Sequence, residues 1–137
     1  MSRRSKQAFD EVVRMLRGLV ERRFNEVVER VSVGDVDVVI SLYDGDVEVL
    51  VLEVLRAARR PLQWRELKQI FHGVVGEDRL RRVVNSLKAR NEVVELTGTK
   101  FTVPECVSLE DLKLVRNPGV ISRILKTKVE GVEEGVW

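Results

Sequence analysis

The sequence predicts an α+β fold that is mostly helical. Apolar residues recur at three- and four-residue steps over most of the chain, which is typical of helices that bury one face. The alternating Val-rich runs are few and short, and these predict strands. With 137 residues, 44% of them apolar, the chain is long enough for one compact domain. We expect three parts, residues 1–34, 35–103 and 104–137.

Composition excludes several classes of protein. One Cys and one His cannot form a disulfide framework or a Cys/His zinc site. No apolar run approaches the ~18 residues of a membrane span, and no signal peptide is visible, so we expect a cytoplasmic, nucleoid-associated protein without membrane contact. No phosphate loop, GxSxG or HExxH motif occurs. We therefore expect no enzyme, no catalytic residue, no cofactor or metal, and no small-molecule substrate.

Residue usage resembles that of proteins from hot environments. Arg outnumbers Lys by 17 to 7, Val occurs 27 times, and Asn, Gln, Cys and Met are scarce. This composition therefore suggests a thermophilic source.

Residues 5–31 are predicted to form one long amphipathic helix, because their apolar residues fill one stripe. Phe9, Val20 and Val31 recur every eleven residues, a spacing closer to a straight helix than to a strict heptad. Two uses of the stripe are equally open. It can pack within the domain, or the segment from Phe9 to Val31 can form the seam of a homodimer.

Residues 35–55 fit two structures. Two Val-rich runs flank Asp44-Gly45, which is typical of a β-hairpin. Val47, Leu50, Val51, Val54 and Leu55 also fit a helix stripe, with Asp44 or Asp46 as its N-cap. We favour a strand near 36–41 followed by a helix over about 47–59. In that helix Val49 and Leu52 fall on the wrong side and need cover from the N-terminal helix.

The following segment has the clearest elements. We expect a short helix over residues 64–72 and a basic helix over residues 77–91, with the Gly-containing loop 73–76 between them. Residues 92–96 and 100–103 predict two strands joined by the tight turn Thr97-Gly98-Thr99. After Pro104, Ser108 begins a capped helix that ends before Pro118. Asn117 is expected to cap a last helix.

The net charge of +2 conceals a strong partition. Residues 35–55 carry six acidic residues and no basic one, whereas residues 56–100 carry eleven basic and five acidic residues. The acidic stretch thus has a net charge of −6 and the following block one of +6. Blocks of this kind are commonly solvated faces, but here the basic block coincides with a recognisable order of elements.

That order resembles the winged helix-turn-helix family of DNA-binding proteins, in its archaeal type, over residues 46–103. The matching segments are AARRPL (57–62), WREL (64–67), DRLRRVVNSLKAR (78–90) and, as the wing, NEVVELTGTKFTV (91–103). The loop 73–76 is longer than the tightest turns of the family. The resemblance implies a winged-helix core over 35–103, flanked by a long N-terminal helix and C-terminal helices. It also implies that the helix 77–91 enters the major groove while the wing contacts the backbone.

A helical wheel of residues 77–91 agrees with this role. With Leu80, Val83, Val84 and Leu87 directed inward, the outward arc holds polar side chains that can bond phosphates and base edges: Arg81, Arg82, Asn85, Ser86 and Lys88. Asp78 also points outward and would repel phosphate. Further phosphate partners are Arg65, Lys68, Thr99 and Lys100. Five or six such contacts predict a slope of log affinity against log salt of roughly −5.

Three functions follow, and we favour the first: a small transcription or chromatin factor that binds duplex DNA, dimeric through the Phe9–Val31 helix or the C-terminal helices. The second is a single-stranded DNA or RNA binder, with a weaker likeness to the single-stranded DNA-binding proteins of thermophilic archaea. The third is a winged helix for protein contact, docking through residues 35–55. Trp64 is expected to fill core, or, if exposed, to stack on an unpaired base. His72 is expected to be a capping or surface residue, and Cys106 an inert packed thiol.

Overall fold

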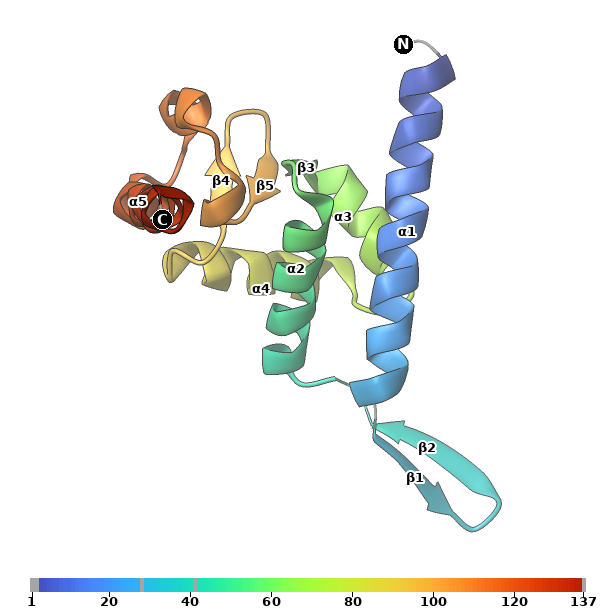
Figure 1. Ribbon diagram of the computed structural model, residues 1–137. Helices are drawn as coiled ribbons and strands as arrows, with labels where there is room; N and C mark the ends of the chain where they lie inside the picture. The colour runs from blue at the N-terminus through green and yellow to red at the C-terminus, as the bar shows by residue number, and fades with distance from the viewer. Residues whose placement is uncertain (1–2, 28, 41, 137) are drawn as a thin grey trace.

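The computed structural model describes residues 3–27, 29–40 and 42–136, and the side chains of residues 11–26, 33–36 and 42–129 (Figure 1). It is mostly helical, as expected, and its described residues form two small antiparallel sheets, one of two strands and one of three. Within its described residues, no helix is both long and apolar enough to cross a membrane.

The N-terminal helix α1 (Arg3–Val27) packs against α2 (Asp44–Ala58) and α3 (Trp64–Phe71). Val13, Leu16 and Val20 of its apolar stripe are buried in the main core. Of the two uses predicted for the stripe, its described side chains therefore show packing within the chain. Phe9, Val27, Val28 and Val31 lie outside the described side chains.

The prediction of one helix over residues 5–31 is wrong at its C-terminal end. The helix ends at Val27, and β1 (Glu29–Val33) pairs with β2 (Val36–Ile40) in an antiparallel hairpin. The two-residue loop begins with Gly34 at a φ of 63°, where glycine carries no steric penalty. Alternating, Val-rich strands that flank such a loop favour a hairpin over a helix. The hairpin projects beyond the end of α1 (Figure 1).

The strand expected near 36–41 is confirmed as β2, and the hairpin around Asp44-Gly45 is not formed. Instead α2 begins at Asp44, earlier than expected, with Tyr43 as its N-cap residue. Asp46 accepts a hydrogen bond from the Tyr43 backbone N–H at 3.3 Å, so neither Asp44 nor Asp46 is the cap itself. Val49 stays exposed rather than covered by α1, whereas Leu52 is half-buried against the core.

The helices α3 and α4 (Glu77–Ala89) match their predicted ranges to within two residues. The strands β4 (Val94–Leu96) and β5 (Lys100–Thr102) form the predicted pair. Their turn needs Gly98 and Thr99 at φ values of 84° and 56°. A third strand, β3 (Leu62–Gln63), was not predicted; it pairs with β5, giving the sheet order β3-β5-β4.

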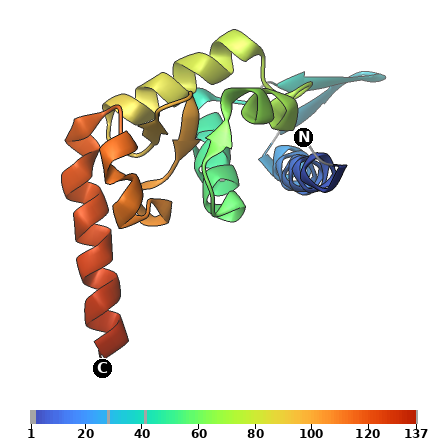
Figure 2. The same cartoon turned by 90° about the horizontal axis from the view of Figure 1, so that it is seen from above.

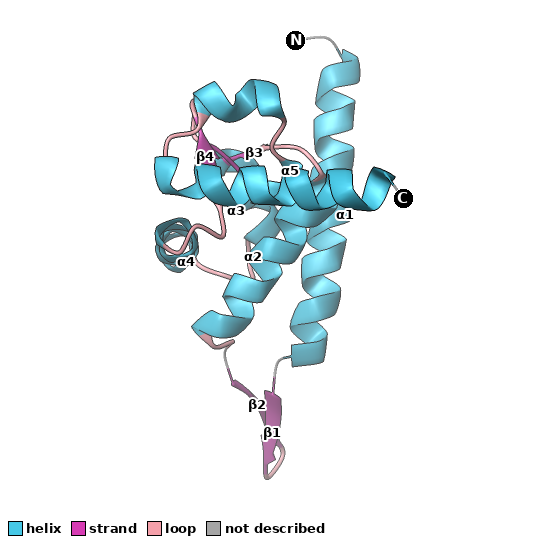
Figure 3. Ribbon diagram, turned by 60° about the vertical axis from the view of Figure 1, so that its left-hand side comes forward, coloured by secondary structure: helices cyan, strands magenta, loops and turns pink. Residues whose placement is uncertain are grey.

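The C-terminal segment lies along the edge of β4 that is not paired with β5. Three short 3₁₀ helices, η1 (Pro104–Cys106), η2 (Leu109–Leu114) and η3 (Pro118–Val120), lead into α5 (Ile121–Val136). Ser108 caps η2 as predicted, since its Oγ accepts from the Asp111 N–H at 3.3 Å. Val94, Leu96, Val107, Val120 and Ile124 form a second, smaller core here. Figures 2 and 3 show α5 extending away from this core.

Asn117 stands at the N-cap position of η3, directly before α5, but its side chain forms no cap hydrogen bond. Its side-chain oxygen accepts from the Glu95 N–H at 3.0 Å, and its amide nitrogen donates to the Val93 carbonyl at 2.9 Å. Asn117 therefore ties the segment before α5 to the edge of β4. A long-range bond of this kind leaves no local sequence signal, so the sequence predicts the cap position of Asn117 but not the partners of its side chain.

Candidate nucleic-acid interface

The helix α4 separates apolar from polar side chains as the helical wheel predicts. Leu80, Val83, Val84 and Leu87 are buried in the main core. Four of the five predicted contact residues on this helix are exposed: Arg81, Arg82, Asn85 and Ser86. Asp78 is exposed too, so the first turn of α4 presents an acidic side chain.

Lys88 does not belong to this outward arc. Its ammonium forms an ion pair with Glu95 of β4 and lies 6.0 Å from the ring centre of Phe101. Only 26% of its side chain is exposed. A helical wheel predicts the side of α4 on which Lys88 lies. It does not include the sheet, to which both partners of Lys88, Glu95 and Phe101, belong.

A small cleft of about 260 Å³ lies between α4 and the turn that joins β4 to β5. It brings together five of the residues predicted for the site: Trp64, Arg81, Asn85, Lys88 and Thr99. Val84, Glu95 and Phe101 complete its lining. The cleft thus combines an aromatic and aliphatic floor with amide, hydroxyl and charged groups.

Trp64 is packed rather than open to a base. Its ring meets Phe101 edge to face, with ring centres 6.1 Å apart at an angle of 69°. The guanidinium of Arg81 lies 5.3 Å from the centre of the Trp64 ring. The expected core packing of Trp64 is confirmed. Because Arg81 covers the ring, a base cannot stack there in this arrangement.

The turn itself is exposed at Thr97, Gly98, Thr99 and Lys100. The Thr99 carbonyl accepts a hydrogen bond from the backbone N–H of Trp64 at 3.1 Å, which ties the turn to the start of α3. Lys100 forms no ion pair with any residue whose side chain the structure describes. A free ammonium at the tip of a turn is well placed to meet a phosphate.

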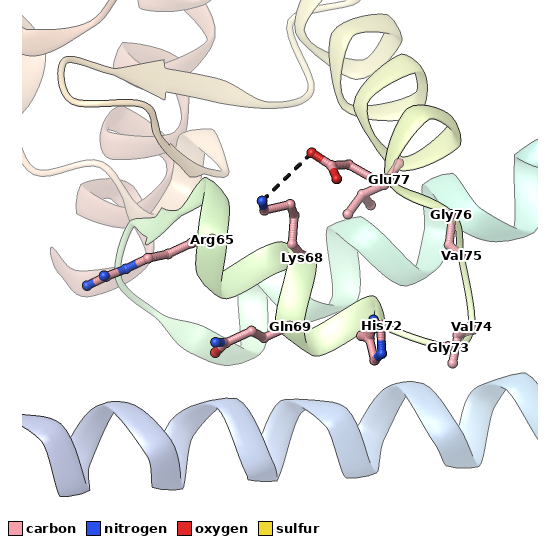
Figure 4. Close-up of a pocket in the computed structure, with 10 residues that line it drawn as sticks. Arg65, Lys68, Gln69, His72, Gly73, Val74, Val75, Gly76 and Glu77 are labelled. Atoms are coloured by element: carbon pink, nitrogen blue, oxygen red, sulfur yellow. Dashed lines mark ion pairs between the residues drawn. The ribbon is translucent and has the colours of Figure 1, made fainter.

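Arg65 and Lys68 lie beside a second hollow, of about 680 Å³, between α3 and the loop that precedes α4 (Figure 4). Lys68 still adjoins Arg81, because both pair with Oε1 of Glu77. Lys68 pairs with Glu77 at 3.7 Å, and Nε of Arg65 donates to the Gln63 side chain at 3.0 Å. Figure 4 shows Lys68 directed toward Glu77 and Arg65 directed away from it. His72, at the end of α3, is exposed on the rim, as expected.

The acidic stretch before α4 pairs with its basic residues, a relation the sequence did not reveal. Asp44 lies 2.8 Å from Arg79 and 3.8 Å from Arg82, and Glu48 lies 2.7 Å from Arg90. The Arg79 hydrogen bond is the main cause that lowers the pKa of Asp44 below its usual value. Acidic residues of the stretch 35–55 therefore neutralise part of the basic charge of residues 56–100 within the same chain.

Two other groups were candidates for chemistry. Cys106 is half-buried, and burial, followed by the nearby charge of Glu105, raises the pKa of its thiol. The thiolate is therefore disfavoured, in agreement with the prediction of an inert thiol. Among the described side chains, His, Cys, Asp and Glu form no cluster of three or more that could hold a metal ion.

Comparison of the chain with protein-family models, curated proteins and solved structures finds no significant match.

Proposed function

We propose that the protein binds nucleic acid, and duplex DNA in particular, through α4 and the β4–β5 turn. The observation that carries this proposal is the placement of Arg81, Arg82, Asn85 and Ser86 on the exposed face of α4, with Lys100 on the adjoining turn. Guanidinium and amide groups on a helix can bond base edges, while a cation on a turn can bond the backbone. The role would be that of a small transcription or chromatin factor, not an enzyme.

The order of elements supports this proposal. α2, β3, α3, α4, β4 and β5 follow one another in the order of a winged helix, and β3 joins the hairpin as its third strand. We propose that this segment is a winged helix in which α4 is the recognition helix and the β4–β5 turn is the wing.

The ion pairs change the expected strength of binding. Arg81, Arg82 and Lys68 each have an acidic neighbour, at 3.2, 3.8 and 3.7 Å respectively, which a phosphate must displace or outcompete. Exposed pairs of this kind contribute little to stability, about 0–1 kcal/mol each, so the exchange is feasible. We expect binding that weakens steeply as salt is raised.

A triple neutralisation tests the interface. The variant Arg81→Ala/Arg82→Ala/Lys100→Ala removes three cations from the proposed contact surface. If Arg82 and Lys100 each meet a phosphate, the slope of log affinity against log salt should become less negative by about 2. Affinity for a 20-base-pair duplex is measured by fluorescence anisotropy at several salt concentrations, with a single strand of the same sequence alongside.

The matched control is Arg14→Ala/Arg22→Ala/Lys113→Ala. It removes the same charge from exposed positions on α1 and η2, where no described side chain forms an ion pair with these residues. The control should bind as the wild type does. Equal weakening by both triple variants would refute the proposed surface, and preference for the single strand would favour a single-strand binder instead.

For the homodimer suggested by the sequence, we propose α5 as the contact rather than α1. The described stripe of α1 is used inside the chain, whereas Leu125 and Val129 of α5 are exposed one helical turn apart. The sequence of α5 places Arg123, Lys126 and Lys128 before Glu130, Glu133 and Glu134. A second copy of α5 in antiparallel orientation would place the basic half of each helix beside the acidic half of the other.

A further inference from the structure

We propose that Trp64 and Glu77 hold the guanidinium of Arg81 in position to read a guanine in the major groove. They would thereby set the sequence preference of the protein. This inference rests on the proposed function, because it requires α4 to lie in the groove. It assigns selectivity partly to Trp64, a residue of α3, and not to α4 alone.

Arg81 is held from two sides. Its Nη2 lies 3.2 Å from Oε1 of Glu77, one turn earlier on α4, and its guanidinium carbon lies 5.3 Å from the centre of the Trp64 ring. The contact with Glu77 engages Nη2, and the ring of Trp64 lies beneath the guanidinium carbon. The donors on Nε and Nη1 have no other partner among the described residues. With 59% of its side chain exposed, Arg81 remains accessible to a base edge.

Trp64 is itself fixed, which makes it a useful support. Its backbone N–H donates to the Thr99 carbonyl at 3.1 Å, and its ring packs edge to face on Phe101. A cation over an indole ring is attracted to its face, and an arginine stacks on such a ring more readily than a lysine does. A guanidinium ordered before binding loses less conformational freedom when it meets a base.

Arg82 provides the contrast within the same helix. It is 68% exposed, and its guanidinium lies 3.8 Å from Asp44 without stacking on any ring in the described part of the chain. Among the described residues, no aromatic ring fixes the plane of the Arg82 guanidinium. Arg82 is therefore suited to a phosphate, which needs only charge, whereas Arg81 is suited to the N7 and O6 acceptors of guanine, which need a planar fork.

Selection from a pool of randomised duplexes, followed by competition, tests this assignment. The wild type should select duplexes with an invariant guanine, and replacing that guanine should weaken binding about 10-fold or more. Arg81→Lys keeps the charge but loses the planar fork, so the preference should fall below about 3-fold while the salt slope is unchanged. The control Arg22→Lys makes the same exchange at an exposed position of α1, outside the proposed surface, and should keep both the preference and the slope.

Trp64 is tested by two substitutions, because removal of a core side chain can unfold the domain. Trp64→Leu removes the ring, and the preference for guanine should fall by about 3-fold or more. Trp64→Phe restores a ring and should restore most of the preference. Glu77→Gln loses the charge that holds Arg81 and should also weaken the preference. Circular dichroism melting confirms that each variant is folded.

The outcomes separate this inference from the proposed function. If the wild type binds duplex DNA without selecting any guanine, or if Arg81→Lys keeps the preference, the reading role is wrong while DNA binding stands. A preference that survives in Trp64→Leu overturns the positioning role of Trp64. Absence of binding to duplex overturns both.

Discussion

Asp44 is the residue that links the acidic stretch to α4. Its carboxylate stands in the first turn of α2, where a negative charge is favourable, and it lies within ion-pair distance of Arg79 and Arg82. The Arg79 hydrogen bond, and then the charges of Arg79 and Arg82, lower the pKa of Asp44, although desolvation opposes them. The folded state therefore favours the ionised carboxylate.

This pKa shift predicts a dependence of stability on pH. The contribution of Asp44 is full above the pKa it has in the unfolded chain, about 3.9, and is lost as the pH falls through the lower pKa of the folded state. Asp44→Asn should be less stable than the wild type at pH 7, and the difference should shrink toward pH 3. Urea unfolding of both proteins at several pH values measures it.

Asp78→Asn is the matched control, because Asp78 is exposed on α4 and forms no ion pair with a described residue. Its difference from the wild type should change little over the same range. A stability difference for Asp44→Asn that does not depend on pH would contradict the role given to this pair.

The sequence predicts which side chains of the site are exposed, but not which residues they contact. The outward positions of Arg81, Arg82, Asn85 and Ser86 follow from helical periodicity alone, and the structure confirms them. The partners of Trp64 and Lys88 could not be predicted in this way, because Phe101 and Glu95 lie on strands of the sheet, which a helical wheel does not include. Periodicity defines which face of a helix is buried, but not which side chain of another element lies opposite.

Among the elements, the clearest predictions were those with strong local signals. α3, α4 and the β4–β5 hairpin have regular apolar spacing with a Gly-containing loop or turn beside them, and they were found close to their expected ranges. β3 was missed because two residues carry no periodicity; pairing with β5 defines it. The β1–β2 hairpin was missed because the apolar spacing of residues 5–31 continues the helical stripe past Val27.

The C-terminal segment depends on Asn117 for its attachment to β4. Asn117→Ala would remove two hydrogen bonds and leave the Glu95 N–H and the Val93 carbonyl without these partners. Because partly buried backbone groups that lose a partner are costly, we expect a loss of roughly 1–3 kcal/mol in the free energy of unfolding. Guanidinium unfolding followed by circular dichroism measures this loss.

Asn85→Ala provides the comparison, since Asn85 is exposed on α4 and has no intramolecular hydrogen bond among the described residues. Its stability should remain within about 0.5 kcal/mol of the wild type. Equal stability of the two variants would show that Asn117 does not anchor the segment.

At the scale of the whole molecule, the near-neutral net charge is more than a sum of separate basic and acidic surfaces, because many of the opposite charges form ion pairs with each other. Arg23 pairs with Glu53, Arg90 with Glu48, and Arg56 with Glu105, so the pairs connect α1, α2, α4 and η1. Charge counts along the sequence give the size of each block. They do not tell whether the blocks form separate faces or neutralise each other, because that depends on how the helices pack.

The proposed α5 pairing makes a prediction about mass in solution. Light scattering should find a dimer for the wild type and a monomer for Val129→Lys, because a charge at this 57% exposed position would disrupt an apolar contact without affecting the core. Met15→Lys places the same charge on α1 at a 58% exposed position and should leave the dimer intact. A monomeric wild type, or a monomer produced by Met15→Lys alone, would contradict the use of α5.

The β1–β2 hairpin also offers a practical advantage. Its loop, Gly34 and Asp35, joins two strands that pair with each other and project from the rest of the molecule, and Val33 and Val36 beside it are 64% and 63% exposed. Exposed loop tips tolerate insertions best. A peptide tag or a fluorophore can therefore be introduced at this loop, so that the proposed binding to DNA is followed by a reporter outside the proposed contact surface.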